Sequence, residues 1–253
     1  MKVQFRIIGV LALLGLLAAL FILPYAYGLL GDVLEEVRLE LGLSESAFRA
    51  MVIAQATLMY AVAALIGGLL YQRAGFKLPF FERAFGEDTE PVDLKQWSWW
   101  TIGTGMVVAL VIIGGDSIFY RLGSPLSLHT AELPAWWAGI MAALSAGIGE
   151  ELLMRFFLMT VLTLLFLKTL RMSVTIAVWS AIILVALIFG ALHLPATAGL
   201  VALTPVVIAR GLILNGVAGV AFGFLYWKQG LESAMVAHFL ADVVIHGLTP
   251  LFF

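Results

Sequence analysis

Three ionisable side chains, Glu150, Glu151 and Arg155, lie inside an otherwise apolar part of the sequence. Residues 135–148 before them and 156–167 after them carry no charge. A charged side chain at the centre of a membrane-spanning helix costs about 2.5–3.5 kcal/mol on the insertion scale. Such a cluster therefore predicts a functional site at membrane depth.

Helix geometry divides this cluster into two parts. Glu151 and Arg155 are four residues apart and share one face of a helix, so an ion pair between them is expected. Glu150 is rotated by about 100° from Glu151 and is left free to face a cavity. Beside a second carboxylate and in an apolar surrounding, Glu150 is a candidate acid or base. The alternative is that all three residues form one buried ionic contact that holds helices together.

Two histidines and an aspartate occupy other apolar segments. His193 ends the run 189–193, and His238 and Asp242 are four residues apart within the last apolar segment. A membrane histidine often does no more than hydrogen-bond a neighbouring helix. Polar side chains in a helical bundle nevertheless face inward, so we expect Glu150, His193, His238 and Asp242 to converge.

Such a set has the parts needed for hydrolysis by an activated water. Glu150 would act as the general base, and His193 would share the proton or bind the water. His238 and Asp242 would stabilise an oxyanion or bind metal. Two histidines and a carboxylate also form a known catalytic zinc set, so zinc held by these four residues is left open. A serine nucleophile is disfavoured, because Ser145 near the cluster has no GxSxG motif around it.

Three further polar residues have simpler interpretations. His129 lies in a polar loop and is expected to be solvated. His246 shares a helix face with His238 and is expected near water at the helix end. Arg210 is an isolated cation that would reach the membrane surface, mark a helix break or bind a substrate carboxylate.

Composition predicts the surroundings of these residues. The chain has 253 residues, of which 62% are hydrophobic and 12% charged, with a mean hydropathy of +1.06. We expect an all-α, multi-pass helical bundle of seven to eight transmembrane helices. A net charge of −2 gives no indication of nucleic-acid binding. The absence of cysteine excludes disulfides and thiol chemistry.

Apolar runs place the expected helices. A first, uncleaved helix over 7–30 would be kinked at Pro24, and Lys2 and Arg6 favour a cytoplasmic N-terminus. The run 134–167 is too long for one straight span and would break at Gly147 and Gly149. A shorter apolar piece would end at Arg210. The other expected spans are 50–71, 101–120 (interrupted near its end by Asp116), 173–193, 212–227 and 231–248. One membrane domain over 1–253 is predicted, with N-terminal helices and a cytoplasmic loop (72–96) in 1–133 and a catalytic core in 134–250.

These motifs resemble those of the CAAX protease and bacteriocin-processing (Abi-type) family of intramembrane proteases, which includes type 2 CAAX prenyl proteases. The family pattern consists of E-E-x-x-x-R, F-x-x-x-H and H-x-x-x-[N/D]. Here the three parts read Glu150-Glu151 with Arg155, Phe189 with His193, and His238 with Asp242. They occur in the right order, and the resemblance covers about residues 134–245.

The resemblance implies an endopeptidase in a prokaryotic plasma membrane that acts on a membrane-embedded or lipid-anchored protein or peptide. It implies that Glu150 acts on the water, that His193, His238 and Asp242 complete the site, and that Glu151, Arg155 and Phe189 support it. It leaves substrate and metal open. Two alternatives from other classes are a non-catalytic immunity or scaffold protein and, less favoured because no internal repeat is visible, a proton-coupled transporter.

Overall fold

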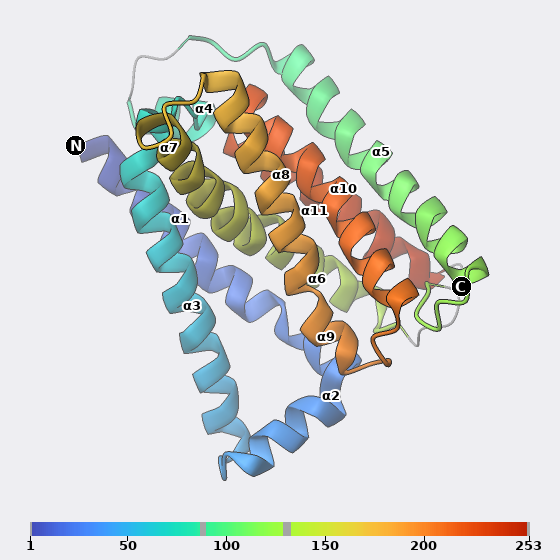
Figure 1. Cartoon of the computed structure of the whole chain (residues 1–253). Helices are drawn as coiled ribbons and strands as arrows, with labels where there is room; N and C mark the ends of the chain where they lie inside the picture. Colours follow the sequence, from blue (N-terminus) through green and yellow to red (C-terminus); the bar gives the residue numbers. More distant parts are fainter. Residues whose placement is uncertain (1, 87–89, 129–132, 252–253) are drawn as a thin grey trace.

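The computed structural model describes residues 2–86, 90–128 and 133–251. Over these residues the chain is helical and contains no strand (Figure 1). The α-helices are α1 (Lys2–Phe21), α2 (Leu23–Glu40), α3 (Glu45–Leu70), α4 (Pro79–Ala84), α5 (Leu94–Arg121), α6 (Trp136–Glu151), α7 (Thr160–Lys168), α8 (Val174–Leu192), α9 (Leu194–Ala198), α10 (Pro205–Gln229) and α11 (Leu231–Asp242). Two π-helical segments, Leu152–Met159 and Val243–Leu248, continue α6 and α11.

Seven helical runs in the described part of the chain are candidates to cross a bilayer. Six are long and apolar enough as single helices, namely Val3–Phe21, Glu45–Ala74, Leu94–Arg121, Val174–Ala198, Pro205–Gln229 and Leu231–Leu248. The seventh is the unbroken run 136–168 formed by α6, the first π-helical segment and α7. The prediction of an all-α polytopic membrane bundle is confirmed.

The first predicted span is divided into two helices. α1 ends at Phe21, and α2 begins at Leu23 with Pro24 in its first turn, where a missing N–H costs nothing. Leu30 has non-helical backbone angles within α2. Figure 1 shows α2 lying across one end of the bundle, between the end of α1 and the start of α3. The prediction of a single kinked helix over 7–30 is therefore wrong.

The long run from 136 to 168 does not break at glycine, which corrects a second prediction. A Cβ on Gly147 would lie 2.8 Å from the carbonyl oxygen of Met235, and one on Gly149 would lie 2.6 Å from the Tyr60 hydroxyl. These two glycines allow close packing instead. The run continues in π geometry just after Glu151.

A third correction concerns the region before Leu212. α10 is one helix from Pro205 onward, because the Thr204 hydroxyl caps it by accepting from Val207 N at 3.4 Å and Pro205 favours the first turn. Arg210 lies inside this helix rather than at its end. α3 is capped by Ser44, whose Oγ accepts from Ala47 N at 3.3 Å.

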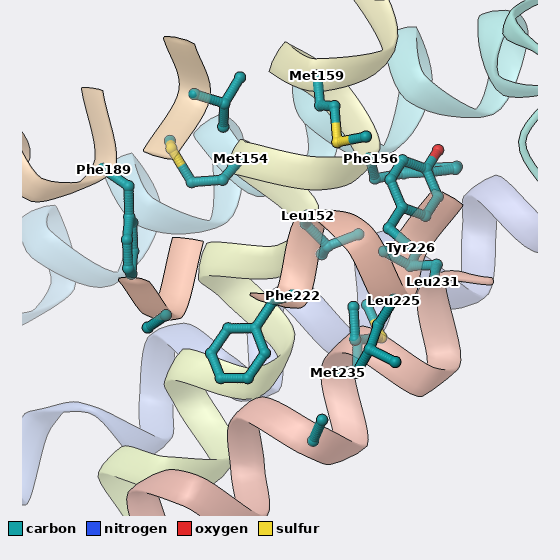
Figure 2. Packing of buried hydrophobic residues seen from close by; sticks show 14 of the residues in the cluster. Leu152, Met154, Phe156, Met159, Phe189, Phe222, Leu225, Tyr226, Leu231 and Met235 are labelled. Atoms are coloured by element: carbon teal, nitrogen blue, oxygen red, sulfur yellow. The ribbon is translucent and has the colours of Figure 1, made fainter. Parts of the chain in front are cut away.

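The packing of the C-terminal helices brings the predicted site residues near one another. α10 packs along α8, while α11 packs against both α5 and α6. The buried core follows the first π-helical segment and continues onto α10 and α11. Figure 2 shows its members Leu152, Met154, Phe156, Met159, Phe189, Phe222, Leu225, Tyr226, Leu231 and Met235.

Candidate active site

One cavity of about 270 Å³ contains all four residues that the sequence predicts to converge. Its lining includes Glu150, His193, His238 and Asp242, together with His246. These residues come from α6, the end of α8, α11 and the second π-helical segment. Glu150 lies about 21 Å of helix rise from the start of α6, which corresponds to the interior of a bilayer about 30 Å thick.

His238 lies at the centre of the charged groups. Its Nδ1 is 2.7 Å from Glu151 Oε1. Its Nε2 is 3.7 Å from Glu150 Oε2 and 3.5 Å from Asp242 Oδ2. Because an ionised carboxylate can only accept, Nδ1 donates to Glu151, and the Nε2 atom faces the two cavity carboxylates.

The two neighbouring glutamates differ in their surroundings. The Glu150 side chain is 34% exposed, whereas the Glu151 side chain is fully buried. Glu151 Oε1 lies 3.0 Å from Arg155 Nη1, as the four-residue spacing predicts. The same oxygen also accepts from His238. Glu151 is thus tied to a residue of the cavity as well as to Arg155, a contact that helix spacing alone does not predict.

Arg155 is held by aromatic rings as well as by charge. Its guanidinium lies over the rings of Phe189 at 4.9 Å and Phe222 at 5.6 Å, and Nη2 donates to Gly219 O at 3.3 Å. Its Nε has no hydrogen-bond partner among the described residues. The Glu151–Arg155 pair is therefore dry and incompletely hydrogen-bonded.

Phe189 connects the first two motifs. Its backbone carbonyl lies 2.8 Å from His193 Nδ1, and its ring meets the His193 ring edge-on at 4.7 Å. Because a carbonyl only accepts, Nδ1 of His193 carries the proton. In a neutral ring the Nε2 atom is then available as a base or ligand.

Sequence reasoning overlooked Phe222, whose ring stacks on His238 with centroids 4.6 Å apart and an interplanar angle of 22°. Figure 2 shows Phe222 on the helix that faces the chain around Leu152. No polar signal marks an apolar residue in an apolar helix. The sequence feature that could have indicated a role for Phe222 is its position on α10, within the segment that resembles the family.

Tyr25 and His246 are further cavity residues outside the predicted set. The Tyr25 hydroxyl lies 3.0 Å from His246 Nδ1, and the two rings meet edge-on at 5.4 Å. Both residues line the cavity. His246 shares a helix face with His238, and this signal could have included it. His129 lies outside the described residues.

Arg210 is not isolated, which corrects its interpretation. Its Nε donates to Asp116 Oδ1 at 2.9 Å. Asp116 is fully buried, and its other oxygen accepts from Ser127 Oγ at 2.8 Å and Leu128 N at 2.9 Å. Asp116 does not interrupt α5, because its charge is met by a cation from α10. The Arg210 side chain reaches the cavity wall.

The described side chains do not form a ready metal site. No group of three or more His, Asp or Glu residues in that part of the chain lies close enough to hold one ion. Zinc needs ligand distances of about 2.0–2.2 Å. Zinc binding by Glu150, His193, His238 and Asp242 would require these side chains to move.

Ser145 is a packing residue in this structure. It is 3% exposed, and its hydroxyl donates to Ala18 O at 2.9 Å. This bond joins α6 to α1 and turns the hydroxyl to a partner outside the cavity.

Fold and cavity together define a polytopic helical membrane protein with an acid–histidine site inside the bundle. Residues 132–244 match the family model described as type II CAAX prenyl endopeptidase, Rce1-like. The match confirms, over this segment, the resemblance to the CAAX protease family. Tyr25 and His246 fall outside the matched segment. Neither the curated proteins nor the solved structures contain a match to the chain.

Proposed function

We propose that this integral membrane protein is an intramembrane endopeptidase that hydrolyses a peptide bond of a membrane-associated protein or peptide. The observation that carries the proposal is the Glu150 carboxylate, which reaches a cavity at membrane depth with its Oε2 3.7 Å from His238 Nε2. The family match supports the reaction class.

In the proposed mechanism Glu150 removes a proton from a water molecule in the cavity. The hydroxide adds to the carbonyl carbon of the substrate, and the His238 ring, protonated on both nitrogens, stabilises the oxyanion by donating a hydrogen bond from Nε2. The C–N bond then breaks. The leaving amine takes a proton from the now protonated Glu150, which returns the enzyme to its starting state.

Glu151 and Arg155 are proposed to position His238 rather than to react. Glu151 accepts from His238 Nδ1 at 2.7 Å, and this bond fixes the ring and directs Nε2 to the cavity. The same arrangement is used widely where a histidine must present one nitrogen to a reacting group. Arg155 supplies the countercharge of Glu151, with its Nη1 3.0 Å from Glu151 Oε1.

The proposed steps use no metal, because the donor groups among the described residues are not grouped around one point. If zinc binds, Glu150, His193, His238 and Asp242 would hold it, and it would polarise the carbonyl or the water. Metal analysis of the purified protein distinguishes the two versions. Activity that survives a chelator supports the metal-free version, and bound zinc with chelator-sensitive activity contradicts it.

The decisive variant is Glu150→Gln, which keeps the shape of the side chain and removes the base. The assay uses proteoliposomes and a set of lipid-anchored peptides, with mass spectrometry of the products. We expect cleavage to fall by about 100-fold or more. Glu36→Gln, the same substitution on exposed α2, is the matched control and should cleave like wild type.

Two outcomes would contradict the proposal. Cleavage by Glu150→Gln at the wild-type rate would remove Glu150 from the chemistry. Tight peptide binding with no cleavage by the wild-type protein under any tested condition would favour the immunity or scaffold function.

A further inference from the structure

Successive long helices cross the bundle in opposite directions, so their ends and connecting segments gather at two ends of the bundle. The residues at these two ends differ in charge. One end, called here the basic end, holds the N-terminus and the connections after α3, α7 and α10. The Leu231 N–H donates to Lys77 O at 3.3 Å, and Phe80 N and Phe81 N both donate to Glu232 at 3.0 Å. Figure 1 shows the N-terminus, α4 and the start of α8 together at this end, and α2 and α9 at the other.

The cationic residues are unequally divided between the two ends. The chain has 14 Lys and Arg residues. Two of them, Arg155 and Arg210, are ion-paired within the bundle. Only Arg38, Arg49 and Arg121 lie at the end opposite the basic end, and the first two are paired with glutamates of their own helices. The remaining nine are at the basic end and are Lys2, Arg6, Arg73, Lys77, Arg83, Lys95, Lys168, Arg171 and Lys228.

This distribution orients the protein. Lys and Arg in short loops remain on the cytoplasmic side, while acidic residues contribute little to orientation. Exposed tryptophans mark both interfaces, with Trp99 near the start of α5 at the basic end and Trp136 at the start of α6 at the other. The basic end is therefore the cytoplasmic one.

The cavity lies toward the opposite end. Its outer lining comes from helix ends at the end opposite the basic end. Of its polar lining groups, Glu150 and His238 lie farthest along their helices from that opening. None of the described lining residues belongs to 151–188 or 223–237, which lead to the basic end. The outer lining residues are Ile22, Tyr25, Leu128, His193, Arg210 and His246.

We infer that the cavity opens on the non-cytoplasmic side, so that the substrate is a membrane-anchored peptide whose scissile bond reaches Glu150 from that side. This inference rests on the proposed function and names the side from which its substrate enters. A peptide whose cleavage site is confined to the cytoplasmic surface would not reach Glu150.

The chain lacks cysteine, so single cysteines can test the inference in otherwise native protein. Ala202→Cys lies in the exposed connection before α10, and Thr169→Cys lies in the exposed turn after α7 at the basic end. Spheroplasts are treated with a membrane-impermeant maleimide before and after permeabilisation. We expect Ala202→Cys to react in intact spheroplasts and Thr169→Cys to react only after permeabilisation. Failure of Ala202→Cys to react, or equal reaction of both cysteines, would overturn the inference.

A third variant reports on the cavity itself. Ile22→Cys lies in the outer lining. Maleimide added from outside should therefore lower its rate of cleavage of a lipid-anchored peptide by at least about tenfold, while treated Ala202→Cys continues to cleave. Continued cleavage by treated Ile22→Cys would overturn the inference. The labelling pattern is independent of activity. Correct labelling without any cleavage would therefore count against the proposed function, whereas reversed labelling with Glu150-dependent cleavage would count against the side of entry alone.

Discussion

The bundle contains two arginine–carboxylate pairs that differ in how they are built. Glu151 and Arg155 lie four residues apart on one helix, and both side chains are fully buried. Asp116 and Arg210 lie on α5 and α10, and the Arg210 side chain keeps 17% of its surface exposed at the cavity. Within the described part of the chain, the first pair leaves Glu151 Oε2 and Arg155 Nε without hydrogen-bond partners, while Asp116 also accepts from Ser127 and Leu128.

This difference separates two uses of charge at membrane depth. The Glu151–Arg155 pair is fully buried, which is costly, and its Glu151 also accepts the hydrogen bond from His238. The Asp116–Arg210 pair is better satisfied and fixes α10 and the connection after α5. One pair serves the predicted active site, and the other serves the wall around it.

The largest expected effect comes from Arg155→Met, which leaves the Glu151 carboxylate buried without its cation. Breaking a buried ion pair by removing one partner costs about 3–5 kcal/mol. We expect the free energy of unfolding in mixed micelles to fall by that amount. The double variant Glu151→Gln/Arg155→Met removes both charges and should recover most of the loss, while peptide cleavage stays impaired because His238 loses its carboxylate.

Equal free energies of unfolding for wild type and Arg155→Met would show that the loss of the Arg155 charge does not destabilise the buried Glu151 carboxylate. Full cleavage by the double variant would contradict the positioning role of Glu151.

A smaller effect is expected from Asp116→Asn. Arg210 loses its countercharge but keeps contact with water in the cavity, and the amide oxygen can still accept one hydrogen bond from Ser127 or Leu128. The expected loss is about 1–3 kcal/mol in the same unfolding measurement. A loss equal to that of Arg155→Met would contradict the distinction between the dry pair and the cavity pair.

The smallest effect is expected at the exposed pair on α2, where Arg38 Nε donates to Glu35 at 2.7 Å. The hydrogen bond from Arg38 lowers the pKa of Glu35. Any stabilisation is therefore present above the unfolded pKa and is lost as the pH falls through the lowered folded pKa. Glu35→Gln should leave the unfolding midpoint unchanged at neutral pH, because exposed pairs contribute little, and a shift as large as that of Asp116→Asn would refute this expectation.

The contrast between the two pairs also explains what the sequence could predict. Helix spacing predicts the Glu151–Arg155 contact because both residues are on one helix. Apolar composition predicts the bundle, and the motif set predicts which residues line the cavity. Asp116 and Arg210 are 94 positions apart, and nothing local to either one indicates the other. Their pairing follows from helix packing.

Two other errors have physical causes of the same kind. Glycine weakens a helix, so the sequence favours a break at Gly147 and Gly149. The structure instead packs Gly147 against Met235 and Gly149 against Tyr60, and both partners lie on other helices that the local sequence does not indicate. Tyr25 was interpreted only as part of an apolar span. Its contact with His246 depends on the turn between α1 and α2, which a hydropathy pattern does not resolve.

The two π-helical segments have a consequence for how the chain tolerates insertions and deletions. Each begins directly after an acidic site residue, one following Glu151 and the other following Asp242. A π turn closes its hydrogen bonds over one more residue than an α turn, and such turns are frequent at functional sites. Because the extra residue is taken up within the π turn, removing one residue from either segment would restore α geometry there, change the side chains that this turn presents and leave the helix beyond it in its orientation. A relative that aligns with a one-residue gap here is therefore expected to keep the course of the helix and to differ from this chain in the turn directly after the acidic residue.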